Sequence, residues 1–244
     1  MINSAKALFI IPCFNEGNRM FGTELSSAFE KYSSIDFLLV DDGSTDSTAT
    51  ILEAFNQKHT NVTSLLLPKN VGKAEAIRSG VTAHSRKEYA FIGYLDADMA
   101  TPVSELVSIL DFAQKKINYR FLMGSRIKRL GSNINRYSYR HYIGRVFATI
   151  ISDIILKTPI YDTQCGAKIM DYKLAQTLFE KPFLTRWLFD VELLLRMKQL
   201  NADFYKEVYE YPLETWIEKG NSKIRFKDML VLPYQLLTIY RAYV

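Results

Sequence analysis

The chain has 244 residues, enough for one large α/β domain or two small ones, and 48% of them are hydrophobic, which excludes wholesale disorder. The formal net charge of +5 suits a phosphate-bearing ligand or an anionic membrane surface and is too small to indicate nucleic acid. Two cysteines, Cys13 and Cys165, predict neither a disulfide framework nor a zinc site. We expect no signal peptide and no membrane span.

The first half alternates between predicted strands and predicted helices. The strand candidates are rich in Val, Ile, Leu, Phe and Tyr, as in strands buried on both faces: Ala7–Ile11, Ile35–Val40, Val62–Leu67, Tyr89–Leu95 and Phe121–Gly124. The helix candidates between them are Met20–Lys31, Asp46–Gln57, Lys73–Ala83 and Val103–Lys116. This alternation predicts an α/β fold with a mostly parallel central sheet and helices on both faces.

The second half begins with a basic segment, residues 126–145, that contains six arginines and lysines and no acid. Helices are predicted at about 140–156, 173–180 and 189–200, and a last helix at Phe226–Tyr243. The segment Phe204–Tyr211 alternates apolar and charged residues, which predicts a half-exposed strand. No repeat or linker composition divides the chain, so we expect one domain with a C-terminal elaboration.

Each predicted strand of the first half ends in a polar cluster. The clusters are PCFNEG, DDGSTD, KNVGK, DAD and GSR, in chain order. One such cluster alone fits ordinary turn chemistry. Because ligands of open α/β sheets bind outside the carboxyl ends of the strands, five clusters together predict a binding site at that edge.

The DAD cluster places Asp96 and Asp98 two residues apart at the end of a strand, so both carboxylates can face one ligand. Hard oxygen ligands of this kind suit Mg²⁺ or Mn²⁺, ions that bridge protein carboxylates and substrate phosphates. The alternative makes Asp98 a helix-capping residue and Asp96 a solvated strand end. Beside four other polar strand ends, the pair favours a metal site at Asp96 and Asp98.

Several motifs together resemble one family of enzymes. They are IPCFNEG, LLVDDGSTDST, NVGKAEAIRSG, LDADMATP, MGSR, DTQCGAKIM, RWLFDVELLLRM and NSKI. In combination they resemble inverting family 2 glycosyltransferases with the GT-A fold, and within them the dolichyl-phosphate glucosyltransferase and polyprenyl-phosphate glycosyltransferase branch. The resemblance implies a nucleotide-sugar-binding half (1–125) and an acceptor-binding half (126–225) of one GT-A domain, followed by a C-terminal amphipathic helix (226–244).

The resemblance implies a donor site for a UDP-sugar. Its residues would be Pro12, Phe14, Asn15, Glu16, Lys73, Asp96, Ala97 and Lys223. Asp41 or Asp42 would accept a hydrogen bond from a base N–H, and the sequence leaves open which of them does so. Asp98 would bind the metal that neutralises the leaving nucleoside diphosphate. Ala100 stands where the mannosyl branch often has a further polar ligand, which favours glucose over mannose.

Two kinds of acceptor fit the resemblance. A polyprenyl phosphate is already an anionic nucleophile and needs electrostatic placement, for which Arg126, Arg140 and Arg136 are the candidates. A saccharide hydroxyl would need a general base, and Asp190 resembles the position where relatives have one. With a phosphate acceptor, Asp190 would orient the sugar hydroxyls. Further contacts to the sugar or the acceptor are expected from Asp162 and Gln164.

The last predicted helix mixes apolar residues with flanking Lys227 and Arg241. It fits two placements, one in a membrane interface beside a lipid substrate and one packed against the domain or a second subunit. With the first, the protein would be cytoplasmic, at the cytoplasmic face of a membrane. A non-catalytic nucleotide-sugar-binding module is a further alternative, against which the complete set of Lys73, Asp96, Asp98 and Arg126 argues.

Overall fold

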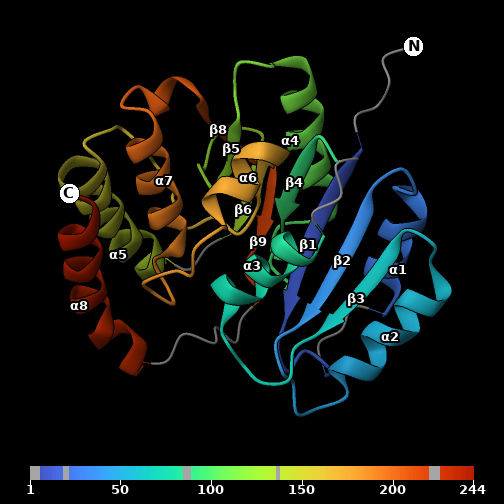
Figure 1. Cartoon of the computed structure of the whole chain (residues 1–244). Coiled ribbons are helices and arrows are strands. Elements are labelled where there is room, and N and C mark those ends of the chain that lie inside the picture. Colours follow the sequence, from blue (N-terminus) through green and yellow to red (C-terminus); the bar gives the residue numbers. More distant parts are fainter. Residues whose placement is uncertain (1–5, 19–21, 85–88, 136–137, 220–225) are drawn as a thin grey trace.

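A computed structural model describes residues 6–18, 22–84, 89–135, 138–219 and 226–244, without the side chains of 22–23, 138–143 and 226–230. In this part of the chain the main sheet has seven strands in the order β3-β2-β1-β4-β7-β5-β8 (Figure 1). They are β1 (Ala7–Cys13), β2 (Asp36–Asp41), β3 (Val62–Leu66), β4 (Phe91–Tyr94), β5 (Phe121–Ser125), β7 (Lys168–Asp171) and β8 (Val208–Pro212). All neighbours are parallel except β7, which runs antiparallel to both β4 and β5.

Helices cover both faces of the sheet (Figure 1). One face carries α1 (Gly22–Lys31), α2 (Thr48–Lys58) and α4 (Val103–Lys115). The other carries α3 (Lys73–Ala83), α6 (Tyr172–Leu178), α7 (Phe189–Leu200), α8 (Phe226–Tyr243), and α5 (Ser138–Thr149) with its π-helical continuation η1 (Ile150–Leu156). A 3-10 turn, η2 (Phe204–Lys206), precedes β8, and β6 (Asn133–Asn135) pairs with β9 (Thr215–Ile217) in a small second sheet.

Two apolar cores result, one on each face of the sheet. On one face the rings of Phe9, Phe29, Phe37 and Phe55 form a cluster with edge-to-face and tilted contacts. On the other face, α3 comes so close to the sheet that a Cβ on Gly80 would lie 3.0 Å from the side chain of Leu38. The strands are buried on both sides, as their apolar composition predicted.

The predicted elements of the first half are confirmed, with ends shifted by at most three residues where the structure describes them. Helices α7 and α8 begin and end at the predicted residues. The predicted strand Phe204–Tyr211 is wrong at its start, because Phe204–Lys206 forms a 3-10 turn and the strand begins at Val208. Strand β7 was not predicted.

The order of the strands determines at which edge of the sheet the candidate site lies. In the order β2-β1-β4, strand β2 lies on one side of β1 and strand β4 lies on the other, so the order of the strands reverses at β1. Ligands of such sheets bind outside the carboxyl ends of the strands at this point of reversal. The residues that follow β1, β2 and β4 therefore share one edge of the sheet. Among the described helices, none is both long and apolar enough to cross a membrane.

Candidate functional site

The loops that follow β1 and β2 are tied together by short hydrogen bonds. Asn15 donates its backbone N–H to Ser44 Oγ at 2.9 Å, and its side-chain oxygen accepts from the N–H of Thr45 at 2.8 Å. Asn15 has a left-handed backbone, with φ 49°. Glu16 donates its backbone N–H to Thr48 Oγ1. The predicted contact between these two loops at one edge is thus present, and Pro12 and Phe14 lie half-buried beside it.

The structure separates the roles of the two aspartates that follow β2. The carboxylate of Asp42 accepts hydrogen bonds from the N–H of Val71 at 2.7 Å, the N–H of Gly72 at 2.8 Å and Asn70 Nδ2 at 2.9 Å. Burial raises the pKa of Asp42, although the two N–H groups oppose this. Among the described residues, the Asp41 carboxylate accepts a hydrogen bond only from the N–H of Ser44, at 3.3 Å to each oxygen. Asp42 therefore holds the 70–72 loop, and Asp41 keeps the capacity for a further donor.

The DAD pair lies directly after β4 and faces Lys73, the first residue of α3. Lys73 Nζ forms an ion pair with Asp96 Oδ1, and the two side chains remain 32% and 37% exposed. Burial acts to raise the pKa of Asp96, but the charge and hydrogen bond of Lys73, together with the charges of Lys168 and Arg126, outweigh it and lower that pKa. Asp98 Oδ1 accepts the N–H of Ala100 at 3.0 Å, and Met99 between them has a left-handed φ of 51°. The pair therefore sits on a sharp turn at the sheet edge, with Ala97 buried.

The DTQCG segment packs against this pair from the second half of the chain. A Cβ on Gly166 would lie 1.9 Å from Asp96 Oδ2, so only glycine allows the observed approach. Gln164, two residues earlier, has a buried side-chain nitrogen with no hydrogen-bond partner among the described residues. Burial raises the pKa of the Cys165 thiol to about 11, which makes it a poor nucleophile.

Asp190 lies at the start of α7 and is engaged by two buried partners. Lys168 Nζ lies 2.6 Å from Asp190 Oδ1, and Tyr94 donates its hydroxyl to the same oxygen at 2.5 Å. The Lys168 and Asp190 side chains are 0% and 4% exposed. Burial, and then the charge of Asp190, raise the pKa of Tyr94 well above its ordinary value. Asp190 is thus the counter-charge of a buried lysine.

Arg126 and Asp162, both predicted site residues, form a forked ion pair. Arg126 Nε and Nη2 each lie 2.7 Å from one oxygen of Asp162, and the two side chains are 13% and 6% exposed. Burial acts to lower the pKa of Arg126, but Asp162 outweighs it and raises that pKa. The guanidinium also lies 5.3 Å from the ring centroid of Trp216. Contact of Arg126 with a phosphate stays a prediction. Asp162 engages Nε and Nη2, so Nη1 is the guanidinium nitrogen that would contact a phosphate.

Three predicted residues cannot be placed at the site. Arg136 and Lys223 lie outside the described residues, and Arg140 lies in α5 with its side chain outside the description. Within the described part, no group of three or more His, Cys, Asp or Glu residues could hold a metal ion. A metal at this edge would therefore take at most Asp96 and Asp98 from the described protein ligands.

Sequence reasoning missed two cations at the site, Lys168 and Arg186. Lys168 lies on the unpredicted strand β7, and nothing in the local sequence indicates that its partner is Asp190. Arg186 reaches back to the 70–72 loop, where its Nη2 donates a hydrogen bond to Asn70 Oδ1. Its Nε lies 2.9 Å from the place that a Cβ on Gly72 would take. The one available signal was a charged residue in the otherwise apolar run LTRWLF.

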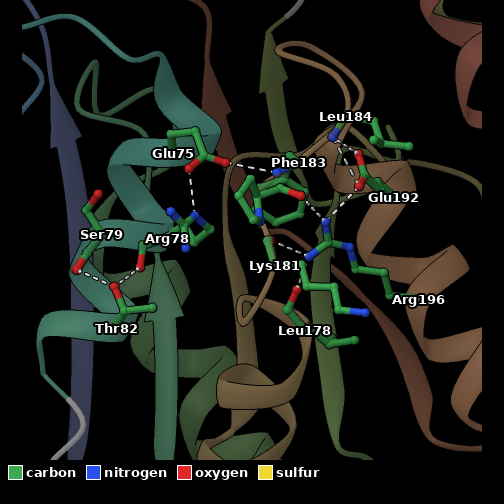
Figure 2. A network of polar contacts seen from close by, with 11 residues as sticks. Glu75, Arg78, Ser79, Thr82, Leu178, Lys181, Phe183, Leu184, Glu192 and Arg196 are labelled. Atoms are coloured by element: carbon green, nitrogen blue, oxygen red, sulfur yellow. Dashed lines mark hydrogen bonds and ion pairs between the residues drawn. The ribbon is translucent and has the colours of Figure 1, made fainter.

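The segment that leads to Arg186 is held from both sides (Figure 2). Glu75 of α3 accepts the N–H of Phe183 at 2.9 Å, and Glu192 of α7 accepts the N–H of Leu184. Arg196 of α7 donates to the carbonyl oxygens of Leu178, Lys181 and Pro182. Tyr243 of α8 donates its hydroxyl to Glu192 Oε1 at 2.8 Å. The turn between α6 and α7 is therefore fixed to α3 and α7, and Tyr243 of α8 holds the Glu192 carboxylate that contacts it.

Comparison with known proteins identifies the class. The family "Glycosyl transferase family 2" matches residues 8–179, so the chain belongs to this family. Its fold resembles the glucosyl-3-phosphoglycerate synthase of Mycobacterium tuberculosis in complex with Mn²⁺, UDP-glucose and phosphoglyceric acid, with a TM-score of 0.69 at 13% identity over 98% of this chain and 79% of that one. The predicted GT-A fold is confirmed.

Three relatives, all from one branch of this family, are similar to the chain over most of its length. Dolichyl-phosphate beta-glucosyltransferase ALG5C of Trichomonas vaginalis is 32% identical over 95% of this chain and 69% of that protein. The human dolichyl-phosphate beta-glucosyltransferase is 32% identical over 96% of this chain and 74% of its own length. The Dictyostelium discoideum enzyme is 31% identical over 88% and 67%. The predicted resemblance to this branch is confirmed as homology.

The buried Lys168–Asp190 pair generates a stability prediction. Asp190→Asn leaves the Lys168 charge buried without its counter-charge, so we expect the free energy of unfolding to fall by about 3–5 kcal/mol in urea denaturation. Replacing both partners, Lys168→Met with Asp190→Leu, removes the stranded charge and should recover part of the loss. Asp111→Asn, on the exposed side of α4, is the matched control. An Asp190→Asn protein as stable as the wild type would contradict the pairing.

Proposed function

We propose that this chain transfers a hexose, glucose from UDP-glucose, to a polyprenyl or dolichyl phosphate with inversion at C1. The observation that carries the proposal is the Asp96-x-Asp98 pair after β4, which faces Lys73 and lies at the same sheet edge as the Asp41 loop. Near full-length similarity to dolichyl-phosphate beta-glucosyltransferases supports the donor and acceptor. The solved neighbour that holds UDP-glucose and Mn²⁺ supports the same donor chemistry.

The nucleoside would bind over the ends of β1 and β2. Asp41 is the better candidate for the base N–H, because the three donors of the 70–72 loop already engage Asp42. Asn15 holds the two loops in register, and Glu16 and Phe14 line the same edge. Arg186, beside Asn70 and Gly72, adds a cation to the donor side.

The residues at the DAD turn fit a divalent cation. Mg²⁺ and Mn²⁺ bind through one or two carboxylates plus substrate phosphates and water, which is what two hard oxygen donors on one turn offer. Asp98 would hold the ion, with Asp96 reaching the ribose or the water molecules of the ion. When bound, the ion would neutralise the leaving nucleoside diphosphate. Lys73, paired with Asp96, would keep the carboxylates from repelling that diphosphate.

The state of Asp190 supports a phosphate acceptor over a saccharide hydroxyl. A general base must reach the proton that it removes, whereas the Asp190 carboxylate is 4% exposed and already engaged by Lys168 and Tyr94. A phosphate acceptor carries its own anionic oxygen and needs no base. The groups that this chain would supply are donors and cations that orient it.

The exposed side of α8 supports contact with a membrane. Val231, Tyr234, Leu237 and Tyr240 are exposed, and residues 231–244 contain no acid and one arginine. Tyrosines on a surface helix are typical of membrane interfaces. A lipid phosphate would be presented at such a surface, so we propose a peripheral location at the cytoplasmic face of a membrane.

Transfer of labelled glucose from UDP-glucose to a short polyprenyl phosphate with Mg²⁺ or Mn²⁺ tests the proposed reaction. We expect lipid-extractable product that disappears with EDTA and falls at least 100-fold in Asp98→Asn, because the ion would lose its protein ligand. Asp111→Asn should transfer at the wild-type rate. GDP-mannose and UDP-N-acetylglucosamine serve as competing donors. Metal-independent transfer, or faster transfer from GDP-mannose, would contradict the proposal.

Membrane contact through α8 predicts co-sedimentation with vesicles that contain phosphatidylserine at low salt. The double variant Tyr234→Ser, Leu237→Asn should reduce the bound fraction several-fold, since it removes two exposed anchors from the helix. Ile117→Asn, at an exposed isoleucine just after α4, is the control and should bind as the wild type does. A wild-type protein that stays in the supernatant would overturn the membrane contact.

A further inference from the structure

One cation reaches the 70–72 loop from the second half of the chain. Arg186 lies in the turn between α6 and α7, 116 residues after Asn70, and donates a hydrogen bond from Nη2 to Asn70 Oδ1. Its side chain also packs against Gly72, where an added Cβ would lie 2.9 Å from Nε and 3.2 Å from Cγ. Because the Arg186 side chain is nevertheless exposed, its guanidinium is open to a ligand at this edge of the sheet.

The polar groups next to Arg186 are already engaged, whereas Arg186 itself is not. Asn70 donates from Nδ2 to Asp42 Oδ2 at 2.9 Å and accepts from Arg186, so both ends of its amide are used. Within the described ranges, Arg186 forms no ion pair with a carboxylate, and Nε and Nη1 make no hydrogen bond. A guanidinium has five N–H donors in a planar fork. Arg186 therefore offers several donors in one fixed plane.

Arg186 and Asp41 are both close to the Asp42 carboxylate. Burial is the main cause that raises the pKa of Asp42, the charge of Arg186 opposes this rise, and the charge of Asp41 adds to it. Charge interactions of this kind weaken with distance, so a guanidinium and a second carboxylate lie near one carboxylate. Asp41 has the capacity for a further donor, and Arg186 has donors to give. The site thus combines an acceptor and a donor at one edge.

The backbone that carries Arg186 is fixed on both sides of this residue. The N–H of Leu184 donates to Glu192 Oε2 at 3.0 Å, and the Glu192 side chain is 0% exposed (Figure 2). The N–H of Trp187 donates to Gln235 Oε1 of α8 at 3.4 Å. A fixed backbone reduces the conformational freedom that an exposed arginine would lose when it binds a ligand. Arg186 is therefore pre-organised beside the 70–72 loop.

An acceptor beside a donor distinguishes between the two pyrimidine bases. Uracil presents an N–H donor with a carbonyl acceptor on each side of it, whereas cytosine presents an acceptor nitrogen beside an amine donor. A carboxylate accepts a hydrogen bond from the uracil N–H and opposes the cytosine nitrogen as acceptor against acceptor. A guanidinium donates to a uracil carbonyl and opposes the cytosine amine as donor against donor. Asp41 and Arg186 together therefore match uracil and mismatch cytosine.

We propose that Arg186 is a specificity-determining residue, which donates a hydrogen bond to a uracil carbonyl of the donor while Asp41 accepts one from the neighbouring N–H. This role rests on the proposed function, from which it takes the UDP-sugar, and adds the residue that selects the base. The diphosphate has its own proposed place at Lys73 and the DAD turn. Arg186 thus makes the second half of the chain part of the base site.

Calorimetry with UDP, CDP and inorganic pyrophosphate, each with Mg²⁺, measures base selection separately from transfer. We expect the wild type to prefer UDP over CDP. Arg186→Gln should weaken UDP binding about tenfold or more, as loss of a charge-assisted hydrogen bond implies. Binding of CDP and pyrophosphate should change by less than about twofold, because a glutamine amide can turn to donate to uracil or to accept from cytosine. Arg186→Lys should keep part of the preference, and Lys115→Gln on α4 is the charge-matched control.

The three probes separate base selection from other roles of Arg186. Equal weakening of UDP, CDP and pyrophosphate in Arg186→Gln would make Arg186 a cation for the diphosphate and overturn base selection. An unchanged preference for UDP over CDP in this variant would make Arg186 a structural contact of the 70–72 loop, with the same consequence. A preference that depends on Arg186 in a wild type that transfers no glucose to polyprenyl phosphate would uphold base selection and refute the proposed reaction.

Discussion

Two buried ion pairs hold the carboxyl edge of the sheet together. Lys168 and Asp190 are almost fully removed from water, and Arg126 and Asp162 nearly so. Breaking either pair would strand a charge in the interior, which costs far more than the pair itself contributes. The edge is therefore rigid without ligands. What remains available beside it is the more exposed Lys73–Asp96 pair and Asp98.

Strand β7 is the element that makes this arrangement possible. It enters the sheet antiparallel between β4 and β5, and its first residue, Lys168, pairs with the start of α7. The turn that precedes it brings Gly166 against Asp96 and Asp162 against Arg126. Strand β7 thus joins β4 of the first half of the chain to β5 and to the residues that follow it. The division into a donor-binding and an acceptor-binding half at residue 125 stays a prediction.

The sequence predicted the donor half well because its signals are local. Apolar runs of strand length, separated by helices and ended by polar clusters, determine a parallel sheet and the edge where ligands bind. The same logic failed for β7, a four-residue strand whose pairing is decided by distant neighbours. It also could not choose between Asp41 and Asp42, because the donors that engage Asp42 come from a loop about 30 residues further along. Nor could it show that Asp190 is buried against Lys168 and Tyr94, because Lys168 lies on the unpredicted strand β7.

The central claim is that the two buried pairs form a fixed frame and that ligands bind to what the frame leaves open. A crystal structure of the complex with UDP, Mg²⁺ and farnesyl phosphate tests it most directly. The account predicts that Lys168–Asp190 and Arg126–Asp162 stay paired and that Asp98 contacts the ion. A complex in which Arg126 or Lys168 leaves its aspartate to bind the diphosphate would contradict it.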